Sequence, residues 1–335
     1  MREARVKGAG GDCYHVMSRI IERKFVLGDV EKEVFRKMLR KCEAFSGVNI
    51  LTYVLMDNHF HVLVEVPERG DVSDTEFLRR LGALYPRPIV QTFAATLKKI
   101  REAGGEKAEE KARKIKAQYT YRMGDVSEFL KTLKQRFTMW YNHRESRHGT
   151  LWEDRFKSIL VEGRGHALAT MAAYIDLNAV RAGLVSDPKD YRYCGYGEAV
   201  AGNTNARAGL GRVMESLSQS AQWTDVRRGY RKHVYLSGEK TEGTSGFEPE
   251  QVKKVLEDGG KLTLAQALRC RVRYFSDGVA LGSKEYVESV FQSHRGYFSA
   301  KRKTGARPMR KADWGGLCTA RALRLEPVAL SALSG

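Results

Sequence analysis

Two histidines on either side of one phenylalanine are the first residues in this sequence that could do chemistry. His59 and His61 lie in the stretch NHFHVLVE, which alternates like a β-strand. Residues i and i+2 of a strand point to the same face, so the two imidazoles share a face while Phe60 points to the core. Two neutral imidazoles at this spacing can bind one divalent metal. The other interpretation is a pair of half-buried histidines on a sheet, and the spacing alone does not exclude it.

A tyrosine and an asparagine four residues apart form a second candidate pair. Tyr174 and Asn178 lie in AAYIDLNAVRAGL, within an alanine-rich helix predicted over 166–184. Residues four apart lie on one helix face, one turn from each other. The Asn178 amide oxygen is a hard ligand that suits Mg²⁺ or Mn²⁺. The Tyr174 hydroxyl could attack the phosphorus of a metal-bound phosphate, although an aromatic residue at the edge of the core is the alternative.

The order of predicted elements indicates how these residues are positioned. Strands are predicted at 13–21, 49–56, 59–66 and 154–162, and helices at 29–45, 73–84, 126–144 and 166–184. The two central strands are joined by Asp57-Asn58, a hairpin signal. This order favours an α+β fold, with a ferredoxin-like or RRM-like antiparallel sheet and helices on one face. His15 lies on the first strand, and the strand phase does not settle whether it reaches the site.

The character of the sequence changes along the chain, which predicts three regions. Residues 1–200 form one domain, with a charged, exposed and partly helical insertion at 85–124. Residues 201–260 are linker-like, and residues 261–335 form a mostly helical region with a basic, flexible-looking tail. Two helical stretches around SDGVALGS in that last region could form a helix-turn-helix, with 283–291 as the recognition helix. Two ordinary packing helices are the alternative.

Charge and cysteine content narrow the class of protein. The formal net charge is +18 and the sequence pI about 9.7, which favours a polyanionic partner such as nucleic acid. A membrane surface is the competing partner, but the sequence has no long apolar segment and its start lacks the apolar core of a signal peptide. Five scattered cysteines without CxxC spacing indicate a reducing, cytoplasmic setting rather than a disulfide framework.

Four stretches together resemble the HUH-type single-tyrosine transposases, and above all the REP-associated tyrosine transposases. They are SRIIERKFVLGD, YVLMDNHFHVLVEVP, RHGTLWEDRFKSILVE and YIDLNAVRAGLVSDPKDYRYCGY. The resemblance implies that His59 and His61 are the metal-binding pair, Asn178 the third ligand and Tyr174 the nucleophile. It also implies a Mg²⁺ or Mn²⁺ cofactor and a single-stranded DNA substrate next to a hairpin. It leaves open whether the protein is a monomer or a homodimer.

Cations and aromatic rings cluster between residues 141 and 158, where they could contact DNA phosphates and stack on unpaired bases. The predicted DNA-contacting residues are Arg144, Arg147, His148, Trp152, Arg155, Lys157 and, near the metal, Arg181. The competing interpretation puts Trp152 and Phe156 in the core and pairs the arginines with neighbouring carboxylates. We expect mixed use, with Phe156 buried and Arg144, Arg147 and Arg155 facing DNA.

The leading functional prediction is a metal-dependent single-stranded DNA endonuclease and strand transferase that forms a 5′-phosphotyrosine intermediate. The alternatives are a sequence-specific DNA-binding protein derived from a transposase, and a zinc metallohydrolase whose histidine pair activates water.

Overall fold

The chain forms two compact units that interleave along the sequence. The computed structural model describes residues 6, 8, 11–218, 220–235, 264–269 and 273–321. Unit 1 comprises residues 1–19, 50–65 and 154–335, and unit 2 comprises residues 20–49 and 66–153. No helix among the described residues is long and apolar enough to cross a membrane.

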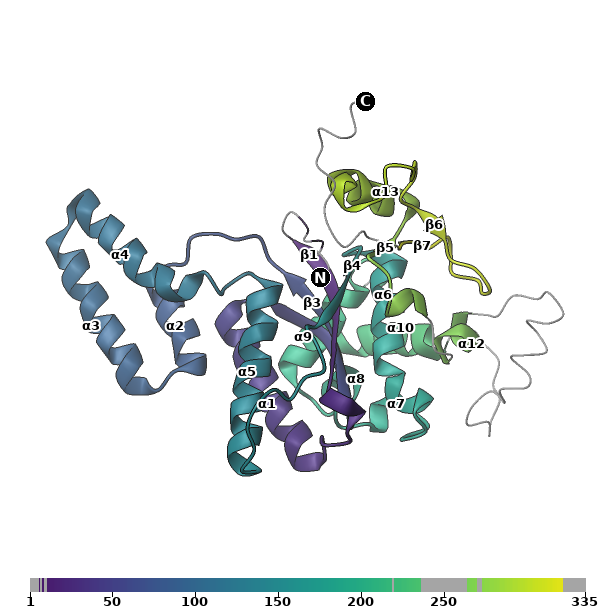
Figure 1. The fold of residues 1–335 in the computed structure, drawn as a ribbon, viewed down its shortest axis with the longest axis horizontal. Coiled ribbons are helices and arrows are strands. Elements are labelled where there is room, and N and C mark those ends of the chain that lie inside the picture. The colour runs from purple at the N-terminus through teal and green to yellow at the C-terminus, as the bar shows by residue number, and fades with distance from the viewer. Residues whose placement is uncertain are drawn as a thin grey trace. The chain divides into compact units, whose positions relative to one another are not determined.

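A seven-stranded sheet carries the candidate site (Figure 1). The strands are β1 (Asp12–Arg19), β2 (Asn49–Leu55), β3 (His59–Val66), β4 (Lys157–Val161), β5 (Ala280–Gly282), β6 (Arg307–Pro308) and β7 (Cys318–Ala320). Their order is β2-β3-β1-β4-β5-β7-β6. The first four strands therefore have the 2-3-1-4 order of a ferredoxin-like sheet, which confirms the predicted α+β fold class. The β4–β5 pair is parallel, so the whole sheet is not antiparallel as expected.

Hydrophobic patterning explains why β1 and β3 hold the histidines in place. Phe60 and Val62 on β3 are fully buried, as the strand alternation predicts. The tight connection between β2 and β3 is closed by a backbone hydrogen bond from Met56 to His59 of 2.9 Å. On β1, His15 lies opposite Ile159 in the antiparallel ladder with β4. Residues from distant parts of the sequence are thus fixed in register around the histidine pair.

Seven α-helices belong to the described part of unit 1. They are α6 (Gly165–Asp176), α7 (Asn178–Arg181), α8 (Gly195–Val200), α9 (Thr204–Met214), α10 (Trp223–Tyr235), α12 (Leu264–Arg269) and α13 (Lys284–Ser293). Short 3₁₀ turns cover Pro188–Asp190, Arg273–Phe275 and Arg295–Tyr297. Helix α6 contacts β4, β5, α9, α10 and α12, so it is central to this unit.

The predicted linker at 201–260 is wrong for its first part. Residues 204–235 form α9 and α10, whose apolar side chains Leu210, Val213, Val226 and Tyr230 are buried. Helix α9 lies close to β2, because a side chain at Gly209 would meet the carbonyl oxygen of Ile50 at 2.5 Å. Residues 236–263 lie outside the described part of the chain.

Of the two interpretations of the C-terminal region, the helix-turn-helix does not fit the structure. The stretch between the two helices forms β5, which pairs with β4 and with β7 and so extends the sheet. Helix α13 is bounded by Ser283, whose hydroxyl accepts a hydrogen bond from Tyr286 N. The tail is folded in part, since Trp314 is buried and β6 and β7 lie within or beyond it.

Unit 2 is helical in the described residues. Its elements are a 3₁₀ turn at Ile21–Arg23, α1 (Asp29–Ser46), α2 (Asp74–Leu84), α3 (Arg87–Ala103), α4 (Gly105–Thr120) and α5 (Val126–Arg144). The insertion at 85–124 forms the paired helices α3 and α4 (Figure 1). It is less exposed than predicted, because Leu97, Ile100, Ala112 and Met123 share a hydrophobic core with Phe77.

Candidate active site

The two β3 histidines lie together, as their spacing predicts. Their ring centroids are 5.2 Å apart and the ring planes meet at 82°. His59 Nδ1 is 2.7 Å from Asn58 Oδ1. An amide oxygen accepts only, so Nδ1 of His59 carries the proton and Nε2 carries the lone pair. His61 is 6% exposed, and burial lowers the pKa of its imidazole well below the usual value, with His15 and His59 adding to the effect.

A third imidazole, which sequence reasoning left undecided, belongs to the same cluster. His15 is fully buried on β1, and its Nε2 lies 2.8 Å from His61 Nδ1. The two rings stack with centroids 5.0 Å apart. Burial lowers the pKa of His15 to about 3, so the ring is neutral at neutral pH. The pairing register of β1 places it there, and the sequence of β1 alone gives no signal of that register.

Tyr174 projects from α6 into this cluster. Its ring centroid is 6.5 Å from that of His61 and 6.4 Å from that of His15. The side chain is 4% exposed, because Phe275 of the C-terminal region packs at a centroid distance of 4.5 Å. The guanidinium carbon of Arg181 lies over the Tyr174 ring, 4.1 Å from its centroid. The structure thus brings together His59, His61 and the predicted nucleophile from β3 and α6.

Asn178 and Arg181 lie on α7, which follows α6 in the chain. Both side chains donate hydrogen bonds to backbone carbonyl oxygens. Asn178 Nδ2 donates to the carbonyl oxygens of Ile175 at 3.2 Å and of Tyr174 at 3.4 Å. This orientation leaves Oδ1 as the amide atom that could face a metal. Arg181 donates to the carbonyl oxygens of Leu268 and Tyr174, each at 2.7 Å. Arg181 therefore braces Tyr174, whereas the sequence predicted that it would contact phosphate.

The atoms that His59 and His61 offer are chemically suited to a divalent metal of the predicted kind. Metal-bound histidines normally hold the proton on the second ring nitrogen through a hydrogen bond, and both β3 histidines have such a partner at Nδ1. Their Nε2 atoms with Asn178 Oδ1 would give two nitrogen ligands and one oxygen ligand. Among the described residues, no group of three or more His, Cys, Asp and Glu side chains could hold a metal.

The segment that holds the histidine pair matches a known protein family. Residues 12–104 match the family described as "Transposase IS200 like". This match confirms the resemblance to a transposase family over these residues. Tyr174 and Asn178 lie beyond the matched residues. The search of curated proteins gave no match.

A solved structure that is similar at low identity covers part of this chain. It is described as a REP-associated tyrosine transposase bound to a REP hairpin. The alignment has 16% identity and a TM-score of 0.39, and it covers 60% of this chain and 87% of that chain.

The structure separates the predicted DNA-contacting residues of unit 2 into paired, exposed and buried ones. Arg144 forms ion pairs with Glu31 and Glu145, as the competing interpretation expected for carboxylate partners. Arg147 donates to Asn142 Oδ1 and to the Thr150 carbonyl oxygen, both at 3.0 Å. His148 is exposed.

The base-stacking prediction for Trp152 is corrected by its burial. The residue is 6% exposed and packs against Phe35 and Phe137. Its indole nitrogen donates to Thr138 Oγ1 at 2.9 Å, so the polar edge of the ring is also satisfied. Trp152 is therefore part of the core of unit 2 and offers no ring face to a base.

In unit 1, Arg155 and Lys157 are exposed at the start of β4, where cations can meet a phosphate backbone. Lys157 Nζ lies 3.7 Å from Asp277 Oδ1, and both side chains remain largely exposed. Phe156 is half-buried, close to the expectation that it belongs to the core.

Proposed function

We propose that this transposase-like protein is a metal-dependent single-stranded DNA endonuclease and strand transferase, with Tyr174 as the nucleophile. One observation supports this assignment most strongly. The ring of Tyr174, on α6, lies 6.5 Å from the ring of His61. The ring of His59, the second β3 histidine, lies 5.2 Å from that of His61, and the family resemblance implies that these two histidines are the metal-binding pair. The resemblance of the motifs to REP-associated tyrosine transposases adds the substrate, a single strand next to a hairpin.

The chemical step follows from a phenol placed against a phosphodiester. Tyr174 Oη would attack phosphorus as its proton leaves, and the bond from phosphorus to the 3′ oxygen would break. The products are a 5′-phosphotyrosine on the protein and a free 3′-OH on the other fragment. Because the phosphodiester count is unchanged, the 3′-OH of another strand can attack the phosphotyrosine and release Tyr174 without ATP.

The side chains around Tyr174 orient it and exclude water. Arg181 holds the backbone carbonyl of Tyr174 and lies against its ring, while Phe275 covers the ring. A divalent ion held by His59, His61 and Asn178 would withdraw negative charge from the scissile phosphate. The burial that keeps the His61 imidazole neutral also preserves the lone pair that such an ion requires.

The decisive experiment is capture of the covalent intermediate. A hairpin with a 3′-labelled single-stranded flank, incubated with the protein and Mn²⁺, should leave label on the protein after denaturation. Tyr174→Phe removes one oxygen, so the adduct should vanish while DNA affinity and the melting temperature stay close to wild type. Mass spectrometry should map the adduct to Tyr174.

Three results would contradict this proposal. An adduct that survives in Tyr174→Phe, or that maps to Tyr191 or Tyr193, would place the nucleophile elsewhere. Cleavage without any adduct would indicate water attack and thus the metallohydrolase alternative. Specific DNA binding with no cleavage at any Mg²⁺ or Mn²⁺ concentration would indicate the pure DNA-binding alternative.

A further inference from the structure

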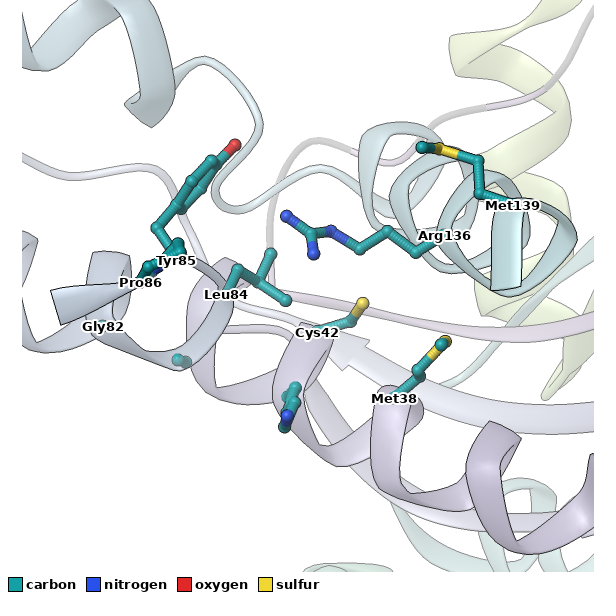
Figure 2. Close-up of a pocket in the computed structure, with 10 residues that line it drawn as sticks. Met38, Cys42, Gly82, Leu84, Tyr85, Pro86, Arg136 and Met139 are labelled. Carbon is teal, nitrogen blue, oxygen red and sulfur yellow. The ribbon is translucent and has the colours of Figure 1, made fainter. Parts of the chain in front are cut away.

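A half-open pocket in unit 2, separate from the histidine cluster, carries an excess of positive charge. Its volume is about 450 Å³, and it is lined by α1, by the end of α2 and by α5. Lys41 and Cys42 come from α1, Tyr85 follows α2, and Arg136 and Met139 come from α5. Figure 2 shows the Arg136 side chain extending from its helix toward Leu84 and Tyr85.

Two guanidinium groups share the ring of Tyr85. Arg136 Cζ is 5.4 Å from the ring centroid, and Arg122 Cζ is 5.7 Å from it. Arg122 also donates to Tyr85 Oη at 2.6 Å. Burial raises the pKa of the Cys42 thiol to about 12, and the charges of Arg136 and Arg122 act against this rise.

These cations differ from the other arginines of the same unit, which are mostly ion-paired. Arg40 lies 2.9 Å from Glu43, Arg80 2.6 Å from Glu76 and Arg101 2.7 Å from Asp74. Within the described ranges, Lys41, Arg122 and Arg136 form no ion pair with a carboxylate.

Arg122 also has an unsatisfied donor. Its Nε is buried without a hydrogen-bond partner in the part of the chain that the structure describes. Like charges held close together in a half-buried place repel each other, and a donor without a partner costs free energy. An anion in the pocket would offset the positive charge of Arg136 and Lys41, the two cations that line it. Guanidinium groups match a phosphate because they donate two parallel hydrogen bonds to its oxygens.

We infer that this pocket binds a backbone phosphate of the DNA strand through Arg136 and Lys41, the two cations that line it. This inference rests on the proposed function for the identity of the ligand, since it is DNA that would supply the phosphate. It adds a contact in unit 2 that does not depend on the metal or on Tyr174.

The test compares DNA binding by Arg136→Gln and Lys41→Gln with that by Arg113→Gln. Arg113 is exposed on α4 of the same unit and forms no ion pair among the described residues, so its variant matches the charge change. Binding of a hairpin with a single-stranded flank is measured by fluorescence anisotropy over a range of NaCl concentrations. We expect Arg136→Gln to weaken binding about tenfold, the size of one charge-assisted contact. The slope of log Kd against log salt should fall by about 0.7, whereas Arg113→Gln should change neither quantity.

Lys41→Gln keeps the test informative if Arg136→Gln misfolds, because Lys41 is exposed and its replacement removes little packing. It should reproduce part of the effect of Arg136→Gln. A wild type that binds DNA, with both pocket variants indistinguishable from Arg113→Gln, would overturn the inference and leave the proposed function intact. A wild type that binds no DNA would count against the proposed function itself.

Titration with inorganic phosphate tests whether the pocket binds free phosphate or a phosphate of the DNA strand. The Nε–H resonance of Arg136, assigned by its loss in Arg136→Gln, should move on titration with phosphate, and the DNA should compete. A shift with inorganic phosphate that the DNA does not itself produce would mean that the pocket takes free phosphate, which would overturn its assignment to the DNA strand. No shift with either ligand would overturn the site altogether.

Discussion

His15 fixes the chemical state of its neighbour His61. With its pKa at about 3 through burial, the His15 ring stays neutral and can accept a proton shared with His61 at 2.8 Å. In that tautomer, His61 donates from Nδ1 and keeps the lone pair on Nε2 for a metal. Under the proposed function, this arrangement would make His15 a positioning residue, which orients His61 without binding the metal itself.

Replacing His15 should therefore weaken metal binding without removing a ligand. His15→Phe keeps a ring of similar shape but offers no acceptor, so we expect the Kd for Mn²⁺ to rise about 10- to 100-fold. The Kd is measured by electron paramagnetic resonance of free Mn²⁺. His15→Gln keeps an acceptor oxygen and should recover part of the affinity. Equal Mn²⁺ affinity in wild type and His15→Phe would mean that His15 only packs.

The sequence predicts those site residues whose relation is set within one element. His59 and His61 share a face because a strand has a period of two. The single helix predicted over 166–184 is instead divided into α6, which carries Tyr174, and α7, which begins at Asn178. The position of His15 depends on the pairing register of β1, which no local period determines. The burial of Trp152 depends on packing with Phe35 and Phe137, which its basic sequence neighbours conceal.

At the scale of the element, a buried carboxyl joins α6 to three other parts of unit 1. Asp176 accepts hydrogen bonds from Thr52 Oγ1 on β2 at 2.7 Å, from Tyr196 N on α8 at 3.3 Å and from Tyr230 Oη on α10. Burial raises the pKa of Asp176 to about 7, although these three hydrogen bonds oppose the rise. The carboxyl that ends α6 thus anchors the helix that carries Tyr174.

This raised pKa makes a prediction about stability and pH. In the unfolded chain Asp176 ionises near pH 4, so between pH 4 and pH 7 deprotonation favours the unfolded state, and the stability contributed by the protonated carboxyl is lost as pH rises. Asp176→Asn does not titrate. The free energy of unfolding of the variant minus that of wild type should increase from pH 4.5 to pH 7.5 by about 2–4 kcal/mol. Urea unfolding at both pH values measures it, and a difference independent of pH would contradict the raised pKa.

The C-terminal region is an integral element of unit 1. Phe275 is fully buried between Tyr174, at 4.5 Å, and Trp314, at 5.7 Å between ring centroids. Sequence reasoning missed this because β5 has only three residues and its partner β4 lies far away in the chain. Strands this short have no detectable alternation, and pairing between distant segments leaves no local pattern.

Removing the Phe275 ring should therefore lower the stability of unit 1 as a whole, rather than only that of the C-terminal region. We expect Phe275→Ala to lower the free energy of unfolding by about 3–5 kcal/mol, in one cooperative transition. Phe25→Ala is the matched control, because Phe25 is 80% exposed and its loss should cost little. Differential scanning calorimetry measures both variants. An extra low-temperature transition confined to Phe275→Ala would show instead that the C-terminal region unfolds by itself.

At the scale of the whole molecule, a net charge of +18 overstates what DNA can use. Many arginines already face carboxylates, so DNA would have to compete with an internal partner for them. Arg144 is the clearest case among the predicted contacts, since it pairs with both Glu31 and Glu145. Arg155 is exposed and has no ion-pair partner in the described segments. The sequence predicts that Arg144 and Arg155 both face DNA. In the described part of the chain, Arg144 is ion-paired and Arg155 is not.

This inequality predicts how salt and single charges govern DNA binding. If about four phosphates are neutralised on a single strand, Kd should rise about 50-fold between 50 and 200 mM NaCl, since each contact contributes about 0.7 to the slope. Arg155→Gln should lower that slope by about 0.7 and weaken binding to all sequences alike. Arg144→Gln should change the slope less, because the Arg144 guanidinium is already paired with Glu31 and Glu145 and so contributes little to binding phosphate. Anisotropy titrations of one labelled hairpin at several salt concentrations measure all three slopes. A larger loss for Arg144→Gln than for Arg155→Gln would mean that DNA displaces both carboxylates, and that the ion pairs seen in the free protein open when it binds.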